Sequence, residues 1–598
     1  MRYLISITLI LSSLFSQNEI EGRWHLVGYE DLVMYEFVDT EPLPPETDAG
    51  WRYTLYSIDG NFGDLDDAGG SPNPYSIVDD IITINMFFGT IVNYQMNFRC
   101  DGQVVEFIDI DYDLIHSTLF REGFDYFNSD CEAGVIINVP DDYATIQDGI
   151  DAASEGDTVL VAAGTYSPST NNEIFPIEMA SGIHLIGSGE EITVIDAEQT
   201  SRVLTMSECY NNFISDLTIT GGLAEGESPN YYGGGIYLYN SNPILINVTI
   251  TNNAATTGGG MYLSFSNSTF KHVTISNNMA DSYGGGVDLH TSNCTLKHVT
   301  ISNNTANWGG GIHYASNSNA SLAHVTISYN QALQGGGMRI IGSDPILTNV
   351  TISNNTSSEG GGIRLFYSYP ILTNVIISNN TAEYYGGGMW VDFSNPILNY
   401  VTISNNIAEY YGGGMRLSNS NPILRNVTIV NNTANNGGGG MYLNSSDPTL
   451  TNSIIWSNSP ESIYIDSGIP LIIYSDIEGG WEGEGNIGDN PLFVDPENGD
   501  YTFMEGSPCI DAGIVIEDIE YCADLPDMGA YEYCEEECGT ELADVTGDGQ
   551  INVLDLVQIS NYILEISIPA YLCAADYNQD GQINVLDLVQ ISNYILNP

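Results

Sequence analysis

Basic residues are scarce in this sequence. Its 598 residues include 12 Lys and Arg against 77 Asp and Glu, which gives a formal net charge of -65. This balance excludes a nucleic-acid-binding protein, because phosphate recognition needs clustered Lys and Arg, and it argues against docking on anionic membranes. Most of the carboxylates lack a basic partner, so they must be solvated, screened by salt or bound to cations such as Ca²⁺. The hydrophobic content of 42% is that of a folded protein and not of a disordered acidic tail.

Long hydrophobic runs are also missing. After the first residues, no stretch approaches the ~20 apolar residues that a membrane-spanning helix needs, so we expect no transmembrane segment in the mature chain. Residues 1–16 contain Arg2, a short apolar stretch and then small residues, which is typical of a secretory signal peptide. The alternative is a buried N-terminal strand. We therefore expect a secreted protein, extracellular or at the cell surface.

Cysteine is too sparse to provide the framework of the fold. The nine cysteines of an exported chain leave at least one unpaired. Cys100 and Cys131 are placed to form a bridge near the end of the first domain. Five further cysteines crowd the C-terminal third, where one or two bridges are expected: Cys509, Cys522, Cys534, Cys538 and Cys573. The spacing CEEEC lacks neighbouring His residues and a second Cys pair, so it does not indicate a zinc site.

Residues 17–131 predict a small antiparallel β-domain. Apolar and polar side chains alternate there in short runs that are separated by Gly, Pro and Asp. The segment opens with Gly22-Arg23-Trp24 and ends near Arg121. On these positions it resembles the lipocalin-like barrels, which have a Gly-x-Trp on the first strand and an Arg from a late strand over that Trp. The resemblance implies either a small apolar ligand or a purely structural barrel.

Internal repetition is the strongest pattern in the chain. Glycine triplets recur every 25 or 26 residues, and each unit also carries an Asn at a fixed place. The units are rich in Val, Ile, Thr, Asn and Gly, which form helices poorly, so they predict short strands and not a helical solenoid. Three short strands in ~25 residues form one coil of a parallel β-helix, in which the Asn column can make a hydrogen-bond ladder. The third glycine of each triplet and the repeated Asn are Gly235, Gly260, Gly286, Gly311, Gly337, Gly362, Gly388, Gly414, Gly440 and Asn253, Asn278, Asn304, Asn330, Asn355, Asn380, Asn406, Asn432.

We expect this β-helix over residues 134–535. A short helix near 144–153, with apolar residues at i, i+4 and i+7 from Ile146, is suited to close one end of the solenoid. Together these segments resemble the right-handed parallel β-helices of the pectate-lyase-like superfamily, and the Gly and I-x-x-N repeats resemble those of polymorphic outer-membrane adhesins. The resemblance implies the fold and leaves function open, because that superfamily includes polysaccharide lyases, glycoside hydrolases, esterases, epimerases and adhesins without catalytic activity.

One column of the repeat is chemically varied. It occupies the second position after each triplet, where the side chain points opposite to its inward neighbours, and we call it the face column. Aromatic rings beside Arg, His and Asp suit sugar binding. Tyr262, Arg364, Trp390 and Arg416 are candidate substrate-binding residues, and Asp288, His313 and Arg339 are candidates for an acid/base and electrophile cluster. The column in full is Tyr237, Tyr262, Asp288, His313, Arg339, Arg364, Trp390, Arg416 and Tyr442.

Other interpretations of the His and face-column residues stay open. An exposed column can simply tolerate varied polar and aromatic residues. The lyases of the superfamily use Ca²⁺ held by carboxylates beside a basic residue, and the hydrolases use several close Asp residues; neither set is apparent on adjacent coils. His272, His298 and His324 share a second column with Asn residues, so stacking with hydrogen bonds explains them better than chemistry.

Two calcium loops end the chain. DVTGDGQINVLD begins at Asp544 and DYNQDGQINVLD at Asp576. Both have oxygen ligands at positions 1, 3, 5, 7, 9 and 12 and Gly at position 6, a pattern that selects Ca²⁺. The predicted ligands are Asp544, Thr546, Asp548, Gln550 (carbonyl), Asn552 and Asp555 in the first loop, and Asp576, Asn578, Asp580, Gln582 (carbonyl), Asn584 and Asp587 in the second.

Each loop precedes the same amphipathic sequence, LVQISNYIL. This duplicated loop and helix over 541–598 resembles a type I dockerin, which implies two Ca²⁺ ions and a cohesin-like scaffold module as partner. Thr546 departs from the usual Asn or Asp. The recognition pairs Val553-Leu554 and Val585-Leu586 are apolar, unlike the polar pairs common in cellulosomal dockerins.

The sequence thus predicts an all-β multidomain protein with a small helical EF-hand-like dockerin. We expect it to recognise or degrade an extracellular polysaccharide while tethered through the dockerin. If it is an enzyme, the fold implies a polysaccharide lyase or a glycoside hydrolase. The alternative is a cell-surface adhesin or structural shaft without catalytic activity.

Overall fold

The fold is taken from a computed structural model. The described residues are 20–26, 33–38, 50–56, 62, 72–78, 80–85, 91–100, 102–110, 114–124, 134–517, 519, 521–523, 525–533, 542–546, 550–563, 572–575, 577, 583 and 585–596. The expected signal peptide lies outside them. The described residues up to 423, with 429–448 and 457–470, form one compact unit, and those of 424–428, 449–456 and 471–598 form a second.

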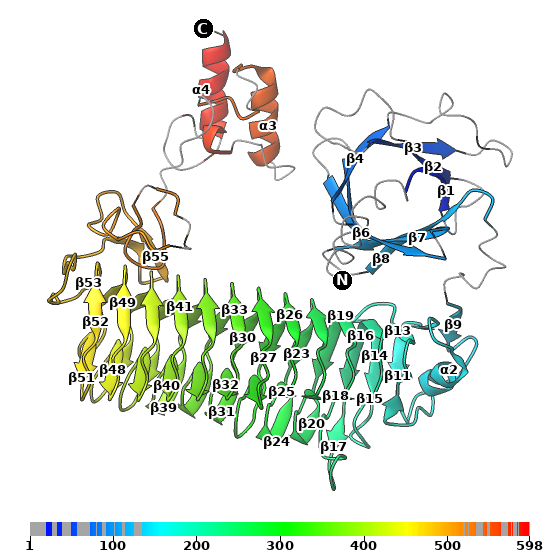
Figure 1. The fold of residues 1–598 in the computed structure, drawn as a ribbon, viewed down its shortest axis with the longest axis horizontal. Helices are drawn as coiled ribbons and strands as arrows, with labels where there is room; N and C mark the ends of the chain where they lie inside the picture. The colour runs from blue at the N-terminus through cyan, green and yellow to red at the C-terminus, as the bar shows by residue number, and fades with distance from the viewer. Residues whose placement is uncertain are drawn as a thin grey trace, which may run out of the picture. The chain divides into compact units, whose positions relative to one another are not determined.

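An eight-stranded antiparallel barrel forms the N-terminal domain, in line with the alternating pattern (Figure 1). Each strand pairs with the next, and β1 also pairs with β8, which closes the barrel. Large apolar side chains, including Trp24, Phe37, Tyr75 and Phe107, fill the core. The strands are β1 (Gly22–Leu26), β2 (Val33–Val38), β3 (Gly50–Tyr56), β4 (Asn73–Val78), β5 (Ile81–Asn85), β6 (Ile91–Arg99), β7 (Val104–Asp109) and β8 (Leu114–Arg121).

The contact between Arg121 and Trp24 joins the two ends of the barrel. The Arg121 guanidinium carbon lies 4.3 Å from the centre of the buried Trp24 ring. The guanidinium also donates to the carbonyls of Glu21 and Gly102, at 2.8 and 2.9 Å. This is the arrangement that the Gly-x-Trp and late Arg positions predict.

Replacing Arg121 with Ala should loosen this closure. The change removes a cation–π contact and two charge-assisted hydrogen bonds, so we expect a loss of about 2–4 kcal/mol of barrel stability. Hydrogen exchange followed by mass spectrometry should then show faster exchange in β1 and β8. Glu122→Gln, at an exposed neighbouring position, is the control and should leave exchange unchanged; equal exchange in both variants would contradict the assignment.

A parallel β-helix follows the barrel, as its repeat predicts. Successive coils place equivalent residues side by side, so β26 (Thr295–Lys297) pairs with β29 (Ser321–Ala323) and β27 (Thr300–Ser302) with β30 (Thr326–Ser328). A third set of strands is interrupted and forms a three-stranded and a five-stranded sheet. It consists of β17 (Leu223–Ala224), β20 (Ala254–Thr257), β24 (Met279–Tyr283), β31 (Gln331–Gln334), β35 (Thr356–Glu359), β39 (Thr381–Tyr385), β43 (Ile407–Ala408) and β47 (Thr433–Ala434).

A 12-stranded parallel sheet forms the remaining face of the β-helix (Figure 1). Each of its strands from β18 to β48 begins directly after a glycine triplet, because the triplet forms the bend that precedes it. In spatial order the strands are β12 (Ile177–Glu178), β15 (Leu204–Ser207), β18 (Ile236–Tyr239), β21 (Met261–Ser264), β25 (Val287–His290), β28 (Ile312–Ala315), β32 (Met338–Ile341), β36 (Ile363–Phe366), β40 (Met389–Asp392), β44 (Met415–Ser418), β48 (Met441–Asn444) and β51 (Ile463–Ile465).

The repeated Asn residues form the expected ladder inside the β-helix. From Asn253 to Asn458, each side-chain Nδ2 donates to the Oδ1 of the Asn on the next coil at 3.0 or 3.1 Å. Each Oδ1 also accepts the backbone N–H of the preceding ladder residue at 2.9–3.0 Å. The ladder therefore satisfies backbone groups that the bend would otherwise leave buried and unpaired.

The glycine triplets are explained by close backbone packing. Gly309, the first residue of its triplet, has φ +67, a conformation that L side chains rarely adopt. A Cβ on Gly311, the third residue, would lie 2.6 Å from the carbonyl oxygen of Gly337 on the next coil. No other residue fits there without moving the backbone.

One end of the β-helix carries the short helix α2 (Ile146–Ala152). Thr145 caps its N-terminus by accepting from the N–H of Asp148, and Ile146 and Ile150 are buried. The helix packs on β9 (Ile136–Val139), β10 (Thr158–Val161) and β12. Ile146 and Ile150 therefore form the buried face that their spacing predicts.

Of the described cysteines, two are disulfide-bonded and three are free. Cys100 and Cys522 each take part in a disulfide bond, while Cys209, Cys294 and Cys509 are free and buried. Cys131, the partner expected for Cys100, lies outside the described residues.

Within the described part of the chain, no helix is long and apolar enough to cross a membrane.

The second unit contains further parallel strands and a small helical domain. β49 (Thr449–Thr451) pairs in parallel with β52 (Leu471–Ile473), as does β50 (Ile454–Trp456) with β53 (Asp476–Ile477), whereas β54 (Phe493–Asp495) pairs antiparallel with β55 (Asp500–Phe503). The helical domain consists of α3 (Val553–Ile563), the 3₁₀ turn η3 (Leu572–Ala575) and α4 (Val585–Leu596). Its small core includes Val545, Ile559 and Ile591.

Candidate functional site

The face column is continuous in the structure. Its nine residues pair strand to strand in unbroken register from Tyr237 to Tyr442. The register also extends the column to Thr205 before Tyr237 and to Tyr464 after Tyr442. All the candidate binding and catalytic residues of the β-helix therefore lie in one line on the 12-stranded sheet.

The face column is much more buried than an exposed column would be. Asp288 is 0% exposed and His313 3% exposed, while Arg364 is 7% exposed. Arg339, Trp390 and Arg416 are half-buried. The interpretation as an exposed column that tolerates any residue is therefore wrong: these side chains pack against one another and against neighbours that the sequence analysis did not identify.

Those neighbours form a column of their own beside the face column, which we call the flanking column. It consists of the residues that directly precede the glycine triplets, and these pair in register from coil to coil. Its fixed place directly before each triplet could have revealed this column, but the sequence analysis did not consider that position. Its members are Tyr232, Thr257, Tyr283, Trp308, Gln334, Glu359, Tyr385 and Tyr411.

Guanidinium groups of the face column pack against aromatic rings of both columns. The guanidinium carbon of Arg364 lies 3.7 Å from the centre of the Trp390 ring, and that of Arg416 lies 3.9 Å from the centre of the Tyr385 ring. Arg364 pairs with Asp392 at 3.0 Å. Among the described residues, Arg416 pairs with no carboxylate, and its buried Nε and the Nε1 of Trp390 have no hydrogen-bond acceptor. This cluster therefore has more donors than acceptors.

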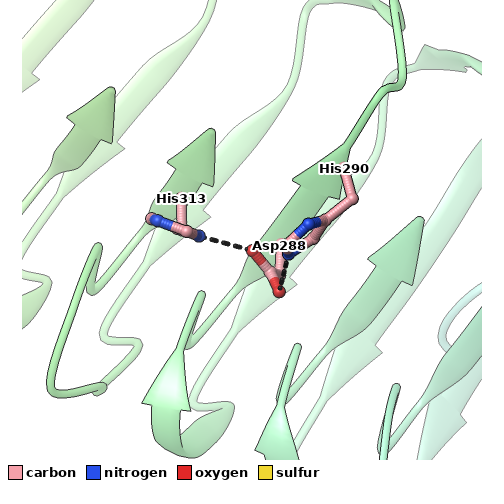
Figure 2. Close-up of side chains that lie close together, drawn as sticks. All are labelled: Asp288, His290 and His313. Atoms are coloured by element: carbon pink, nitrogen blue, oxygen red, sulfur yellow. Dashed lines mark hydrogen bonds and ion pairs between the residues drawn. The ribbon is translucent and has the colours of Figure 1, made fainter. Parts of the chain in front are cut away.

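A hydrogen-bonded chain links three successive strands beside that cluster. His313 Nδ1 lies 2.6 Å from Asp288 Oδ1, and Arg339 Nη1 lies 3.1 Å from His313 Nε2. Because a guanidinium only donates, Nε2 is the acceptor and Nδ1 carries the proton toward Asp288. His290, two residues after Asp288, approaches its other oxygen at 3.2 Å (Figure 2). His290 is a site residue that the sequence analysis missed.

The electrostatics agree with a neutral His313. Burial lowers its pKa below the usual value, although Asp288 acts in the opposite direction. Burial and the neighbouring Arg364 lower the pKa of Arg339 to about 10, so this guanidinium remains charged at neutral pH. Asp288 and His313 are closed off from solvent, so they do not present a reactive group to a substrate in this conformation.

A cavity of about 580 Å³ lies at the Tyr237 end of the face column. Arg202 forms part of its wall, with its guanidinium carbon 4.7 Å from the centre of the Tyr237 ring and Nη2 donating to the Pro229 carbonyl at 2.7 Å. Glu178 and Glu225 also line it. The sequence analysis assigned no role to these three charged residues, because they precede the regular repeats.

The column that contains His272, His298 and His324 is a stack of rings, as expected. The ring centres of His272 and His298 are 5.0 Å apart, and those of His298 and His324 are 4.9 Å apart. All three residues have φ near +50, a conformation that Asn and His adopt more readily than most side chains. The position in the bend therefore accounts for both the His and the Asn residues of this column.

The described part of the first calcium loop fits a hard cation. The carboxylates of Asp544 and Asp555 are buried, at 1% and 0% exposed, and both approach the hydroxyl of Thr546, at 3.2 and 3.0 Å. The side chain of Asn552 caps α3 by accepting from the N–H of Leu554. Buried, converging oxygens with two negative charges are the environment that Ca²⁺ prefers.

The other predicted calcium ligands are only partly described. Gln550 is exposed, and the Asp587 carboxylate of the second loop is buried in the first turn of α4. The remaining ligands lie outside the described residues: Asp548, Asp576, Asn578, Asp580, Gln582 and Asn584.

Comparison of the sequence with protein families identifies the β-helix and the small helical domain. The family described as "Right handed beta helix region" matches 159–324, 271–399 and 310–476, which together span more than half of the chain. The protein belongs to the right-handed β-helix family. The family described as "Dockerin type I domain" matches 542–596. No curated protein matches the chain significantly.

The dockerin has direct consequences for the protein. Dockerins of this type bind calcium and dock onto cohesin modules, and proteins that carry them are generally assembled outside the cell or at its surface. This β-helix protein is therefore built to be tethered through its C-terminal domain.

Several solved structures are similar to parts of this chain. The pectate lyase Pel9A is 14% identical with a TM-score of 0.35, and the match covers 65% of this chain and 90% of that one. The Agl-KA catalytic domain is 16% identical with a TM-score of 0.40, over 60% and 71%. PfbA, described as a surface adhesin of Streptococcus pneumoniae, is 12% identical with a TM-score of 0.34, over 55% and 87%. At these identities and TM-scores the likeness carries no conclusion about the activity of this chain.

Proposed function

We propose that the protein binds an extended acidic polysaccharide along the face column while its dockerin holds it on a cohesin-bearing scaffold. The observation that carries this proposal is the line of guanidiniums among aromatic rings. Arg339, Arg364 and Arg416 are three of only 12 basic residues in the chain, and they share one column. Clustered guanidiniums suit carboxylate ligands, and the rings between them suit the apolar faces of sugars.

The acidity of the whole chain does not prevent this binding. At physiological ionic strength, charges more than about 8 Å apart are largely screened. The carboxylates of an incoming polymer therefore respond mainly to the guanidiniums that they contact. At low salt the net charge of -65 should slow their approach, so the association rate should rise when salt is raised to physiological levels.

Binding is better supported than catalysis at the column itself. The two acid/base candidates, Asp288 and His313, are buried and hydrogen-bonded to each other. Arg416 and Trp390, in contrast, are half-buried and keep unpaired donors. A carboxylate-rich ligand would pair with the half-buried guanidinium of Arg416, which has no carboxylate partner among the described residues.

Polyuronate binding tests the proposal. Binding of polygalacturonate and alginate to the full chain in Ca²⁺ should weaken roughly 10- to 100-fold in the variant Arg339→Gln/Arg416→Gln, because charged hydrogen bonds contribute about 1.5–3 kcal/mol each. Arg425→Gln removes the same charge from β45 (Ile423–Arg425) and is the control. Binding of neutral glucans should be weak throughout.

Three results would contradict the proposal or change it. Equal polyuronate binding in the double variant and the control would refute the role of the face column. Time-dependent release of oligosaccharides, detected by mass spectrometry, would make the protein an enzyme. No binding and no release would favour an adhesin or structural shaft.

The dockerin surface also indicates the nature of the scaffold partner. Val553 and Leu554, at the predicted recognition positions, are 63% and 61% exposed, and Val557 on the next turn of α3 is 49% exposed. Apolar side chains in this arrangement are matched best by an apolar surface. We expect the cohesin partner to present one.

A further inference from the structure

Asp288, His290 and His313 bring three metal-ligating groups to one point of the β-helix (Figure 2). Asp288 and His290 lie two residues apart on β25, so their side chains leave the same face of the strand. His313 on β28 is in register with Asp288. One ligand atom from each residue lies within 4.8 Å of the other two.

We propose that these three side chains bind a divalent transition-metal ion such as Zn²⁺. Two imidazole nitrogens and one carboxylate oxygen are typical ligands of Zn²⁺ and Fe²⁺, whereas Ca²⁺ and Mg²⁺ prefer oxygen ligands only. The site is therefore distinct in chemistry from the calcium loops of the dockerin. It does not depend on the proposed polysaccharide binding.

The positions of the donors favour this assignment. His313 and His290 each approach a different oxygen of Asp288, at 2.6 and 3.2 Å. In the metal-free protein a proton lies between each ring and the carboxylate. A cation bound by both nitrogens and the carboxylate would replace those protons, and bond lengths of about 2.0–2.2 Å require the three donors to close around it.

The site is accessible to solvent on one side, and aromatic rings pack against both of its histidines. The His290 side chain is 33% exposed, so a cation can enter from solvent on that side. The Tyr262 ring packs on His290 and the Tyr283 ring on His313, with ring centres 5.4 and 4.8 Å apart. A dication with one carboxylate ligand keeps a net positive charge, so its open positions would attract hydroxide or a carboxylate.

Arg339 makes metal binding switchable. Its Nη1 donates to His313 Nε2 at 3.1 Å in the metal-free arrangement. When a metal occupies Nδ1, a neutral imidazole must carry its proton on Nε2, which then faces a second donor. Arg339 must turn away for the metal to bind, so the Arg339–His313 hydrogen bond and the metal exclude each other.

Cobalt titration of the full chain tests the site. With Ca²⁺ in excess to fill the dockerin, Co²⁺ should give visible absorption bands that Zn²⁺ abolishes by competition. His290→Gln should lose this signal, with thermal unfolding unchanged because His290 is partly exposed. His324→Gln, which removes an exposed imidazole from the His stack, is the matched control and should keep the signal.

A second variant tests the switch. In Arg339→Gln, a side-chain oxygen can accept the Nε2 proton, so Co²⁺ affinity should rise about tenfold, as is typical when the hydrogen-bond partner of a metal ligand is changed. An absent cobalt signal would refute the proposal. So would a signal that disappears in His324→Gln and persists in His290→Gln, because the ion would then belong to the His stack.

Discussion

Removal of calcium from the full chain should abolish the helical circular dichroism of α3 and α4. The buried carboxylates of Asp544 and Asp555 converge on the Thr546 hydroxyl, so without a cation two negative charges remain buried together. Such an arrangement costs several kcal/mol per ion. Since the metal-binding free energy serves as folding free energy in small metal-dependent domains, we expect complete loss of this helicity in excess EDTA and recovery with Ca²⁺.

Single-ligand variants should assign the ions to the two loops. Isothermal titration should show two Ca²⁺ ions bound by the full chain, and one of the two lost in Asp555→Asn or in Asp587→Asn. Glu517→Gln, which changes an exposed carboxylate outside the loops, is the control. Helicity that persists in EDTA would refute calcium-dependent folding of the dockerin. The strands of the β-helix should remain folded in EDTA, because their ladder contains no metal ligand.

Replacing Asn330 with Leu should locally unfold the β-helix. The Asn330 Oδ1 accepts from the N–H and the Nδ2 of Asn304, and its own Nδ2 donates to the carbonyl of Ile301 and to Asn355. Leu has a similar volume but leaves two buried donors of Asn304 without an acceptor. At about 1–3 kcal/mol for each unsatisfied group, we expect a loss of about 2–6 kcal/mol.

Hydrogen exchange is the suitable measurement, because each coil of a solenoid contacts only its neighbours and unfolding need not be two-state. Protection should fall in the strands around Asn304 and Asn355 and stay high in distant coils. The control is Gln331→Ala at the next residue, which is exposed and should change stability by less than about 0.5 kcal/mol. Equal protection in both variants would show that the ladder is not needed for stability.

Much of the fold could be predicted from the sequence because the repeat constrains it strongly. The spacing of the glycine triplets implies one coil per ~25 residues, and the Asn at a fixed offset implies a ladder that the structure contains. The face column was also predictable, since a constant offset from each triplet means a constant register between parallel strands. Asp288, His313 and Arg339 were therefore expected on successive strands, and they lie there.

The surroundings of the column could not be predicted in the same way. Its burial depends on the flanking column, where Tyr283 and Trp308 pack beside Gln334 and Glu359. Those residues share a position in the repeat but not a residue type, so no pattern of hydrophobicity marks them. His290 was missed for a similar reason: the equivalent positions on the adjacent strands are Ser264 and Ala315, neither of which suggests a site.

The sequence by itself predicted the order of the domains, the stacking of the coils and the two calcium loops. These follow from periodicity and from ligand spacing, which are local along the chain. Only the tertiary structure decided which side chains of different coils meet, how deeply they are buried and which donors remain unpaired. The physical reason is that the burial of these side chains depends on residues about 25 positions away, whose packing no local pattern specifies. The pKa of His313 and the freedom of the Arg339 side chain to move depend on that burial.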